Sequence, residues 1–194
     1  MAQIIQDKTH GTYHLSSAAN VKNYEVQRTN NFEFVVTDLD NLKRAGGDTA
    51  HGNITNGQEV LRLSVVEANV PHFNQGIIEI KRGNTIMKAA GTPTFDAGSL
   101  RVNDYIGADT KSVLLAWQAL SYDVTNEHVG QMADYKKNCT LVEYTPDYKM
   151  VRYWDLIGCW VSGISEDSFN FETNDKKTIT ATIQFDRAIM HLPD

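Results

Sequence analysis

Residues 139–154 have the sequence CTLVEYTPDYKMVRYW, and this stretch decides the fold class. Two apolar-rich runs, 139–144 and 150–154, flank the segment Thr145-Pro146-Asp147-Tyr148. Proline at the second position of a β-turn presets φ, and aspartate suits the position after it. The pattern predicts a β-hairpin whose second strand continues through residues 157–161.

Alternation of apolar and polar residues predicts further strands on both sides of this hairpin. We expect them at 32–36, 60–66, 76–81, 85–89, 94–102 and 178–185. In the segment 60–66, Leu61, Leu63 and Val65 should share one face of a strand. Residues 82–84 mark a turn, and Ala97-Gly98 marks a bulge.

One helix stands out from the strand pattern. Asp109 is a suitable N-cap, and the residues that follow recur at helical spacing to give one apolar stripe. The stripe consists of Val113, Leu114, Trp117 and Leu120. With about seven strands and one helix, the sequence predicts a mainly β domain, a β-sandwich or part-barrel with the helix packed on it.

Two segments lack a regular pattern within what we expect to be a single domain, 1–194. Residues 1–30 form a polar N-terminal arm, and 40–59 is rich in glycine, asparagine and charge. A loop of about 20 residues is uncommon in a compact domain unless it is functional or disordered. Either 40–59 is disordered or it reaches an adjacent subunit. The candidates for that contact are Arg44, Asp48, His51, Asn53 and Asn56.

The charge balance restricts the possible partners. The 194 residues include 18 basic and 24 acidic ones, a formal net charge of -6. This argues against a nucleic-acid-binding surface and is compatible with a surface past which DNA slides. No apolar run approaches the ~18–20 residues that span a bilayer, and the first residues lack a signal-peptide pattern. We therefore expect no membrane anchor and folding in a cytoplasm.

The two cysteines, Cys139 and Cys159, are expected to be free thiols. A regular hairpin would place Cys139 opposite Trp154 and leave Cys159 about 16 Å along the ladder. That separation exceeds the ~7 Å Cα limit for a disulfide.

No catalytic or metal-binding motif is present. The six histidines form no His-Glu-x-x-His pattern, and no Gly-x-Ser-x-Gly elbow occurs. The segment 47–52 has the glycine spacing of a P-loop, but Asn53-Ile54 replaces the required Lys-Ser/Thr. We therefore expect no cofactor, no metal and no enzyme activity.

Three blocks in a fixed order carry a resemblance to a known family. The first is NTIMKAAGTPTFD, residues 84–96; the second is the predicted helix with Ala116-Trp117-Gln118 at its end. The third runs from Tyr135-Lys136-Lys137 to Gly158-Cys159-Trp160, before a polar loop and a terminal strand that ends near Asp186. Over 32–188 the chain resembles the tail tube proteins of contractile-tailed bacteriophages. Its 1–30 arm and 40–59 insertion are longer than is usual in that family.

The resemblance implies a structural role. Proteins of this family form hexameric rings in which each subunit adds strands to an inner β-barrel, and the rings stack into a tube that conducts the genome. It implies partners for this chain: other copies, the sheath, the baseplate and terminator proteins, and the tape measure protein and DNA that occupy the lumen without specific binding. The location would be the virion tail, after assembly in the host cytoplasm.

A conduit for DNA should have a polar and on balance acidic lumen. The candidates on predicted strands are Glu79, Glu143 and Asp155. Four other functions remain open from the sequence. They are a baseplate protein that initiates the tube, the inner tube of a contractile injection system, a carbohydrate-binding β-sandwich using Trp154 and Trp160, and a hydrolase without a recognisable motif.

Overall fold

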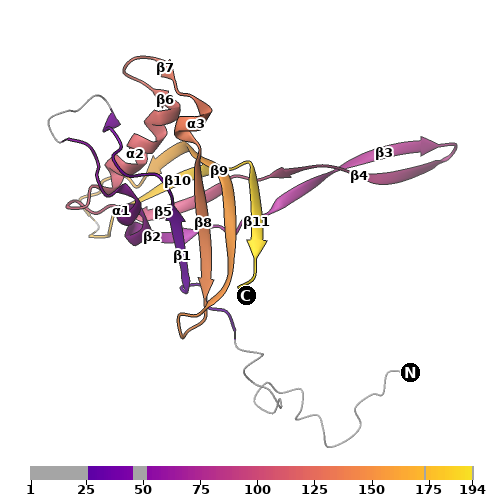
Figure 1. Ribbon diagram of the computed structural model, residues 1–194, viewed down its shortest axis with the longest axis horizontal. Coiled ribbons are helices and arrows are strands. Elements are labelled where there is room, and N and C mark those ends of the chain that lie inside the picture. The colour runs from indigo at the N-terminus through magenta and orange to yellow at the C-terminus, as the bar shows by residue number, and fades with distance from the viewer. Residues whose placement is uncertain (1–25, 46–51, 173, 194) are drawn as a thin grey trace, which may run out of the picture.

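The computed structural model describes residues 26–45, 52–172 and 174–193. Within them the chain is mainly β, as predicted, with eleven strands and three short helices (Figure 1). The strands are β1 Phe32–Val36, β2 Val65–Ala68, β3 Phe73–Arg82, β4 Thr85–Phe95, β5 Gly98–Asn103, β6 Tyr122–Asp123, β7 His128–Val129, β8 Lys137–Tyr144, β9 Met150–Glu166, β10 Thr178–Gln184 and β11 Arg187–His191. The helices are α1 Gly57–Ser64, α2 Thr110–Ser121 and α3 Met132–Tyr135.

The main sheet has the strand order β1-β8-β9-β10-β5-β2, and β11 pairs separately with β9. Every pairing is antiparallel. The long strand β9 joins the two halves, because its first part pairs with β8 and β11 and its second part with β10. The sheet stays open among the described residues, so β1, β2 and β11 are its edges.

The core lies between the sheet and helices α1 and α2. Val113, Leu114 and Trp117 of α2 are buried, and Leu120 is partly buried against them. Trp117 also donates a hydrogen bond from Nε1 to the Tyr135 carbonyl, 3.1 Å away. The predicted apolar stripe therefore faces the core. The Trp117 indole is held both by apolar packing and by its hydrogen bond to the Tyr135 carbonyl.

The strand predicted at 60–66 is wrong, because residues 57–64 form helix α1. The buried positions are Gly57, Val60, Leu61 and Ser64, a helical spacing, whereas Leu63 is 69% exposed. Leu61, Leu63 and Val65 alternate as in a strand, and the prediction rested on this alternation instead of the helical spacing of the buried residues. Only the last residues of the segment continue into a strand, β2.

The segment 40–59 is not a structureless loop throughout. Leu42 and Ile54 are both buried, and their backbones form an isolated antiparallel bridge. Residues 57–59 already belong to α1. The described parts of this segment are therefore tied into the core from both ends.

The cysteine register predicted from a regular hairpin is also wrong. Cys139 lies opposite Leu156, and Lys137 lies opposite Cys159, with two irregularities in the ladder. Gly158, at a φ of 73°, accommodates one of them. Burial and a hydrogen bond with the Cys159 thiol raise the pKa of Cys139, so the two buried thiols are neighbours and not far apart.

The predicted strands around Gly83 form a hairpin, but it is longer than expected. It turns in two residues, and Gly83 supplies the positive φ, 59°, that the first turn position needs. Between β4 and β5 the chain leaves the hairpin and joins the main sheet, so a link of two residues replaces the bulge expected at 97–98. The short strand β11 was not predicted.

Candidate assembly surfaces

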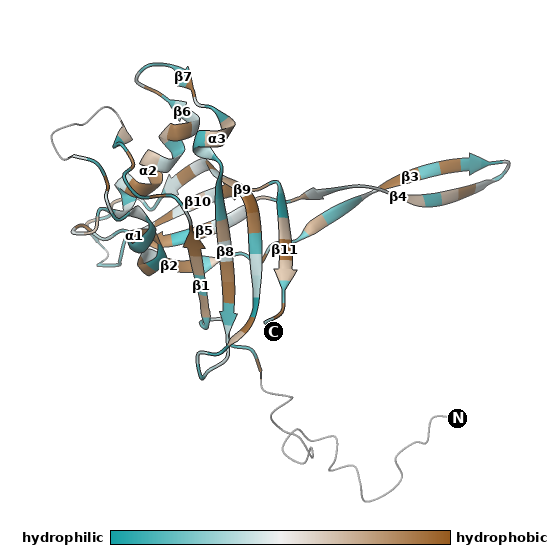
Figure 2. Cartoon of the chain, in the orientation of Figure 1, coloured by the Kyte–Doolittle hydropathy of each residue, from teal (hydrophilic) through white to brown (hydrophobic). Residues whose placement is uncertain are grey.

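Hairpin β3–β4 projects away from the main sheet (Figure 1). Ten residues of strand rise about 33 Å. Every residue of β3 is exposed, including large apolar side chains that normally belong in a core. Figure 2 shows apolar positions along both strands of the hairpin. An exposed apolar arm of this length marks an interaction surface.

The register gives the hairpin two different faces. Cα partners point to the same side, so Ile78 with Ala89 and Ile80 with Met87 share one face. We call these four residues the apolar hairpin face. The opposite face carries Glu79 with Lys88 and Lys81 with Ile86. The two faces therefore differ: the first is apolar apart from Arg82 near the turn, whereas the second mixes charged side chains with Ile77 and Ile86.

A second exposed apolar group lies at the other end of β5. It comes from the loops 104–109 and 167–172, and we call it the far-end surface. Its members are Tyr105, Ile106, Phe169 and Phe171, of which Ile106 is 98% and Phe169 is 88% exposed. The Lys177 ammonium lies 4.6 Å from the centre of the Phe169 ring, a cation–π contact that orients the side chain.

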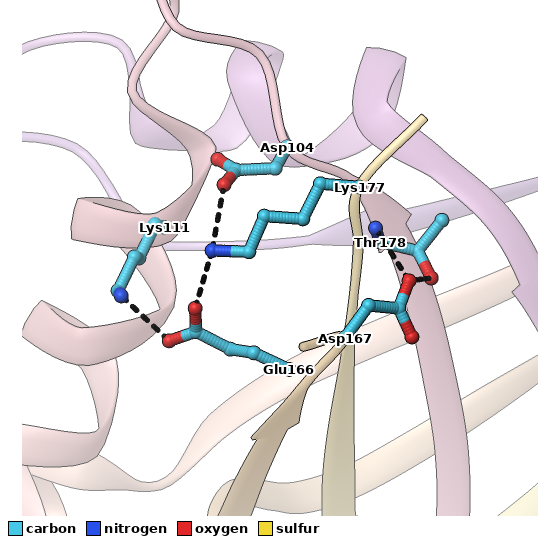
Figure 3. A network of polar contacts seen from close by, with 6 residues as sticks. All are labelled: Asp104, Lys111, Glu166, Asp167, Lys177 and Thr178. Atoms are coloured by element: carbon cyan, nitrogen blue, oxygen red, sulfur yellow. Dashed lines mark hydrogen bonds and ion pairs between the residues drawn. The ribbon is translucent and has the colours of Figure 1, made fainter. Parts of the chain in front are cut away.

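A polar network holds the two loops together (Figure 3). Lys177 Nζ binds Glu166 Oε2 at 2.6 Å and lies 3.5 Å from Asp104 Oδ2, and Lys111 Nζ binds Glu166 Oε1 at 2.7 Å. Hydrogen bonds from Lys111 and Lys177 hold the pKa of Glu166 below its usual value. The same contact with Glu166 raises the pKa of Lys177. The network links the start of α2, the end of β9 and both loops.

Asp167 fixes the base of the loop that carries Phe169 and Phe171. Its Oδ2 accepts hydrogen bonds from the Thr178 backbone N–H at 2.9 Å and the Thr178 hydroxyl at 2.6 Å. These bonds lower the pKa of Asp167. The exposed phenylalanines therefore stand on a loop whose base is fixed by hydrogen bonds.

The face of the sheet that points away from the helices is polar. It carries the hydroxyl residues that alternate with the buried apolar positions of β8, β9 and β10: Thr140, Ser162, Ser165, Thr180 and Thr182. Ser162 Oγ donates to the Thr182 carbonyl at 3.2 Å, and Ser165 Oγ lies 3.5 Å from the Thr180 carbonyl. Thr140 also donates to Asp155, so three of these five hydroxyls bond within the sheet. Arg101 lies opposite Thr180 and shares this face with Asp155.

The three acidic residues predicted to line a lumen lie on three different surfaces. Asp155 is on the hydroxyl face, where its Oδ1 accepts from Thr140 at 3.3 Å. Glu143 points to the opposite face, in register with Arg152, which it binds at 2.8 Å. Glu79 is on the charged side of the hairpin. The structure does not bring these carboxylates together.

The predicted contact residues of segment 40–59 have different environments. Arg44 is half-buried and forms an ion pair with Asp109. Burial alone would raise the pKa of Asp109, but the Arg44 hydrogen bond and charge lower it overall. Asn53 and Asn56 are exposed. Asp48 and His51, and the arm 1–25, lie outside the described residues.

A hollow of about 660 Å³ opens at the end of the core between β1, β2, β8 and β9. Trp154 lines it beside Leu141 and Phe32, and its Nε1 has no hydrogen-bond partner among the described residues. Trp160 packs instead edge-on against Tyr135, with ring centroids 5.8 Å apart. The two tryptophans do not form a shared exposed platform of the kind that a carbohydrate site would need.

The described residues contain no group of three metal-ligating side chains. Of the helices that the structure describes, none has the length and apolar character needed to span a bilayer.

Comparison by sequence finds no matching protein-family model and no matching curated protein. Comparison of structures does. The tube-terminating cap of the anti-feeding prophage matches with a TM-score of 0.62 at 14% identity, over 87% of this chain and 93% of that chain. A chain of the PVC sheath–tube complex, an extracellular contractile injection system, matches with a TM-score of 0.61 at 16% identity, over 91% of this chain and 99% of that chain.

The chain shares its fold with these tube and cap proteins, and we call it the tube fold. The PVC sheath/tube terminator shares it as well, with a TM-score of 0.60 at 18% identity, over 86% of this chain and 97% of that chain. The tube fold confirms, at the level of architecture, the resemblance seen in the order of the sequence blocks. Each match spans nearly the whole of the other chain, so the likeness concerns a complete fold and not a fragment.

Sequence reasoning missed the far-end surface. Phe169-Asn170-Phe171 stands inside a stretch that is otherwise polar, from Glu166 to Lys176. Two aromatic residues in a polar loop are a signal for an exposed contact, because a loop has no core of its own to receive them.

Proposed function

We propose that this chain is a structural, non-catalytic subunit that polymerises as stacked hexameric rings into the inner tube of a contractile tail, through which a phage genome passes. The observation that carries the proposal is the exposed apolar hairpin on a tube fold. An apolar arm that its own subunit leaves in water gains its stability from other copies. A conduit also needs no catalytic centre, which agrees with the absence of a catalytic motif in the sequence.

The open sheet supports ring formation. Its edge strands β1, β2 and β11 present unpaired backbone groups, which risk uncontrolled pairing in a lone subunit. Joining the sheets of neighbouring copies around a ring would satisfy these edges, as closure does in any barrel. The lateral contact closes by rotation, whereas a stacking contact between rings stays open and yields a filament.

The hydroxyl face is the surface that we assign to the lumen. Its groups are mostly neutral, and the charges of Asp155 and Arg101 offset each other, so the face should attract phosphate only weakly. Glu143 would face a lumen only at the open end of the core. Glu79 would face a lumen only if the hairpin itself lines it. The tube would thus conduct DNA, or contain a tape measure protein, without holding either.

The same proposal covers the other partners and the location. Solved relatives of the tube fold come from a sheath–tube complex, a tube terminator and a baseplate, the last with a TM-score of 0.52. We propose a sheath, a baseplate and a terminator as partners, the virion tail as the location and the host cytoplasm as the place of assembly. The arm 1–30 and the exposed Asn53 and Asn56 of segment 40–59 remain proposed ring-to-ring contacts.

A second candidate is favoured by the relatives themselves. Two of the solved structures are a tube-terminating cap and a sheath/tube terminator of injection systems. A protein of that kind, or a baseplate initiator, would form one ring and stop. The inner tube of an injection system would form tubes with no genome to conduct.

Negative-stain electron microscopy of the purified chain at high concentration separates these functions. Long tubes with a regular axial repeat are the expected result, and single rings would favour a cap or an initiator. A preparation that stays monomeric under all conditions would overturn the assembly proposal.

Charge reversal tests the lumen. Ser162→Arg with Thr182→Arg places cations on the hydroxyl face, so tubes of the variant should retain double-stranded DNA in a filter-binding assay where the parent does not. Thr125→Arg with Tyr148→Arg is the control for added charge, because both side chains are exposed and belong neither to the hydroxyl face nor to a proposed contact. Equal DNA retention by both variants would contradict the lumen assignment.

A further inference from the structure

The apolar hairpin face and the far-end surface lie on segments that are attached to opposite ends of β5. Hairpin β3–β4 joins the start of β5 through Asp96-Ala97, and the loop 104–109 leaves its end after Asn103. Thr178 pairs with Asn103, which places the base of the second loop at that same end. A strand of this length spans about 17 Å, and the hairpin extends outward from the near end (Figure 1). The two surfaces therefore do not meet within one subunit.

Their charges are opposite. The hairpin, 73–95, has three basic residues and one acidic one, a net charge of +2. The loops 104–109 and 166–177 together have six acidic residues and two basic ones, and Arg44 and Lys111 pair with two of the acidic ones, which leaves a net charge of -2. At the exposed positions, Lys81 and Arg82 stand beside the hairpin tip, and Glu172, Asp175 and Lys176 stand in the second loop. Opposite charge at the rim of two apolar surfaces favours their association and sets its direction.

Contacts within the subunit fix the base of the far-end surface. The Lys177 network ties both loops to α2, and the cation–π contact orients Phe169. Two aromatic rings on a fixed base are the type of anchor that dominates binding energy at protein interfaces. The hairpin offers aliphatic side chains on one face, which suit packing against rings.

We propose that the apolar hairpin face of one copy docks on the far-end surface of a second copy, head to tail. The inference rests on the proposed function in that it requires copies to assemble, and it names the two surfaces that meet. Both surfaces belong to the same chain and lie at opposite ends, so the contact is heterologous and each docked copy leaves one free surface of each kind. Such a contact repeats without limit and builds a filament.

Two variants test the two sides separately. The hairpin variant is Ile78→Ser with Ile80→Ser, and the loop variant is Phe169→Ser with Phe171→Ser. Tyr148→Ser is the control, because that side chain is 83% exposed in the β8–β9 turn and belongs to neither surface. We expect at least a tenfold fall in tube length or number for both variants by electron microscopy, with parental assembly for the control and unchanged circular dichroism for all three.

Mixing the two variants gives a sharper result. The hairpin variant keeps an intact far-end surface, and the loop variant keeps an intact hairpin. A mixture therefore has one working contact per pair, so pairs of assembling units should form while tubes should not. Analytical ultracentrifugation distinguishes pairs from the separate variants and from tubes.

Charge exchange tests the direction of docking. Lys81→Glu with Arg82→Glu should weaken assembly, and adding Glu172→Lys with Asp175→Lys in the same chain should restore it. Failure of this restoration, or tubes of parental length from the loop variant, would overturn the docking proposal. Loss of tubes in the hairpin variant alone would place the receiving surface elsewhere, for example at the hollow beside Trp154, and also overturn it. If the parent chain itself never assembles, the proposed function fails, which the parental control reveals independently.

Discussion

Ile179 in β10 and Ile80 in β3 are both strand isoleucines, yet the first is fully buried and the second is 45% exposed. The main sheet packs its apolar side on two helices, and the hydroxyls of Ser162 and Ser165 on its other side bond to its own backbone. Hairpin β3–β4 has a backbone ladder with one register shift, and no apolar layer of the described residues covers either face. The sheet is thus stabilised within the subunit, and the hairpin is built to be stabilised by another copy.

This difference separates two classes of substitution. Changes in the sheet and its helices should lower the free energy of unfolding of the isolated subunit, whereas changes in the hairpin should act on assembly.

Trp117→Ala should have the largest effect. The side chain is fully buried between α2 and the sheet, and its Nε1 donates to the Tyr135 carbonyl at 3.1 Å. Truncation of a buried tryptophan leaves a cavity and an unpaired acceptor, and costs about 3–5 kcal/mol of unfolding free energy. Urea denaturation measures the loss. A loss below about 1 kcal/mol would show that α2 is not packed as described.

Ser64→Ala should have the next effect. Ser64 Oγ donates to the Val60 carbonyl at 2.6 Å, so the Thr110 hydroxyl donates to Ser64 across 3.0 Å and links α1 to α2. Both residues are buried. Removal of Ser64 leaves the Thr110 donor unpaired and should cost about 1–3 kcal/mol.

Thr110→Val completes a double-mutant cycle with Ser64→Ala. If the hydroxyls bond each other, the double variant should lose less than the sum of the two single losses, because the second change removes a donor that is already unpaired. Additive losses in urea denaturation would contradict this bond.

The sequence correctly predicted those parts of the fold in which the spacing of the apolar residues fits only a helix or only a strand. The strand 32–36 and the helix stripe of α2 were correct, because each apolar position there has a single structural explanation. The prediction for segment 60–66 failed because Leu61 fits both an alternating and a helical pattern, and the burial of Ser64 together with the exposure of Leu63 decides between them. The cysteine register failed because a ladder irregularity leaves no mark in a single sequence.

The candidate surfaces were predictable to a smaller extent. Glu79, Glu143 and Asp155 could be placed on strands from the sequence, but the face on which each lies depends on register shifts along β9 and on the hairpin leaving the sheet. Exposure of Ile78 and Ile80 was not predictable either, because a strand pattern does not say whether another layer covers it. Tertiary structure had to supply both facts.

The far-end network predicts a small pH dependence. The pKa of Glu166 is lowered by hydrogen bonds from Lys111 and Lys177, so its contribution to stability is present above the ordinary glutamate pKa of ~4.3 and is lost as the pH falls through the lower folded value. Thermal unfolding between pH 5 and pH 3 should therefore show a steeper acid loss in the parent than in Glu166→Gln. Glu59→Gln, an exposed carboxylate on α1, is the control and should keep the parental slope. Equal slopes in all three would show that the network does not contribute in solution.

Ile80→Ser should leave the stability of the isolated subunit within about 0.5 kcal/mol of the parent, the range typical of surface substitutions. The side chain loses little on truncation because water already covers much of it, and the β3–β4 backbone ladder does not depend on it. Ile179→Ser is the matched control: the same change in a fully buried strand position leaves a cavity and a buried hydroxyl, so it should destabilise the subunit by several times as much, about 2–5 kcal/mol. Urea denaturation at a concentration too low for assembly compares the two. A substantial loss for Ile80→Ser under those conditions would mean that the hairpin folds back on its own subunit, and the contrast between sheet and hairpin would no longer hold.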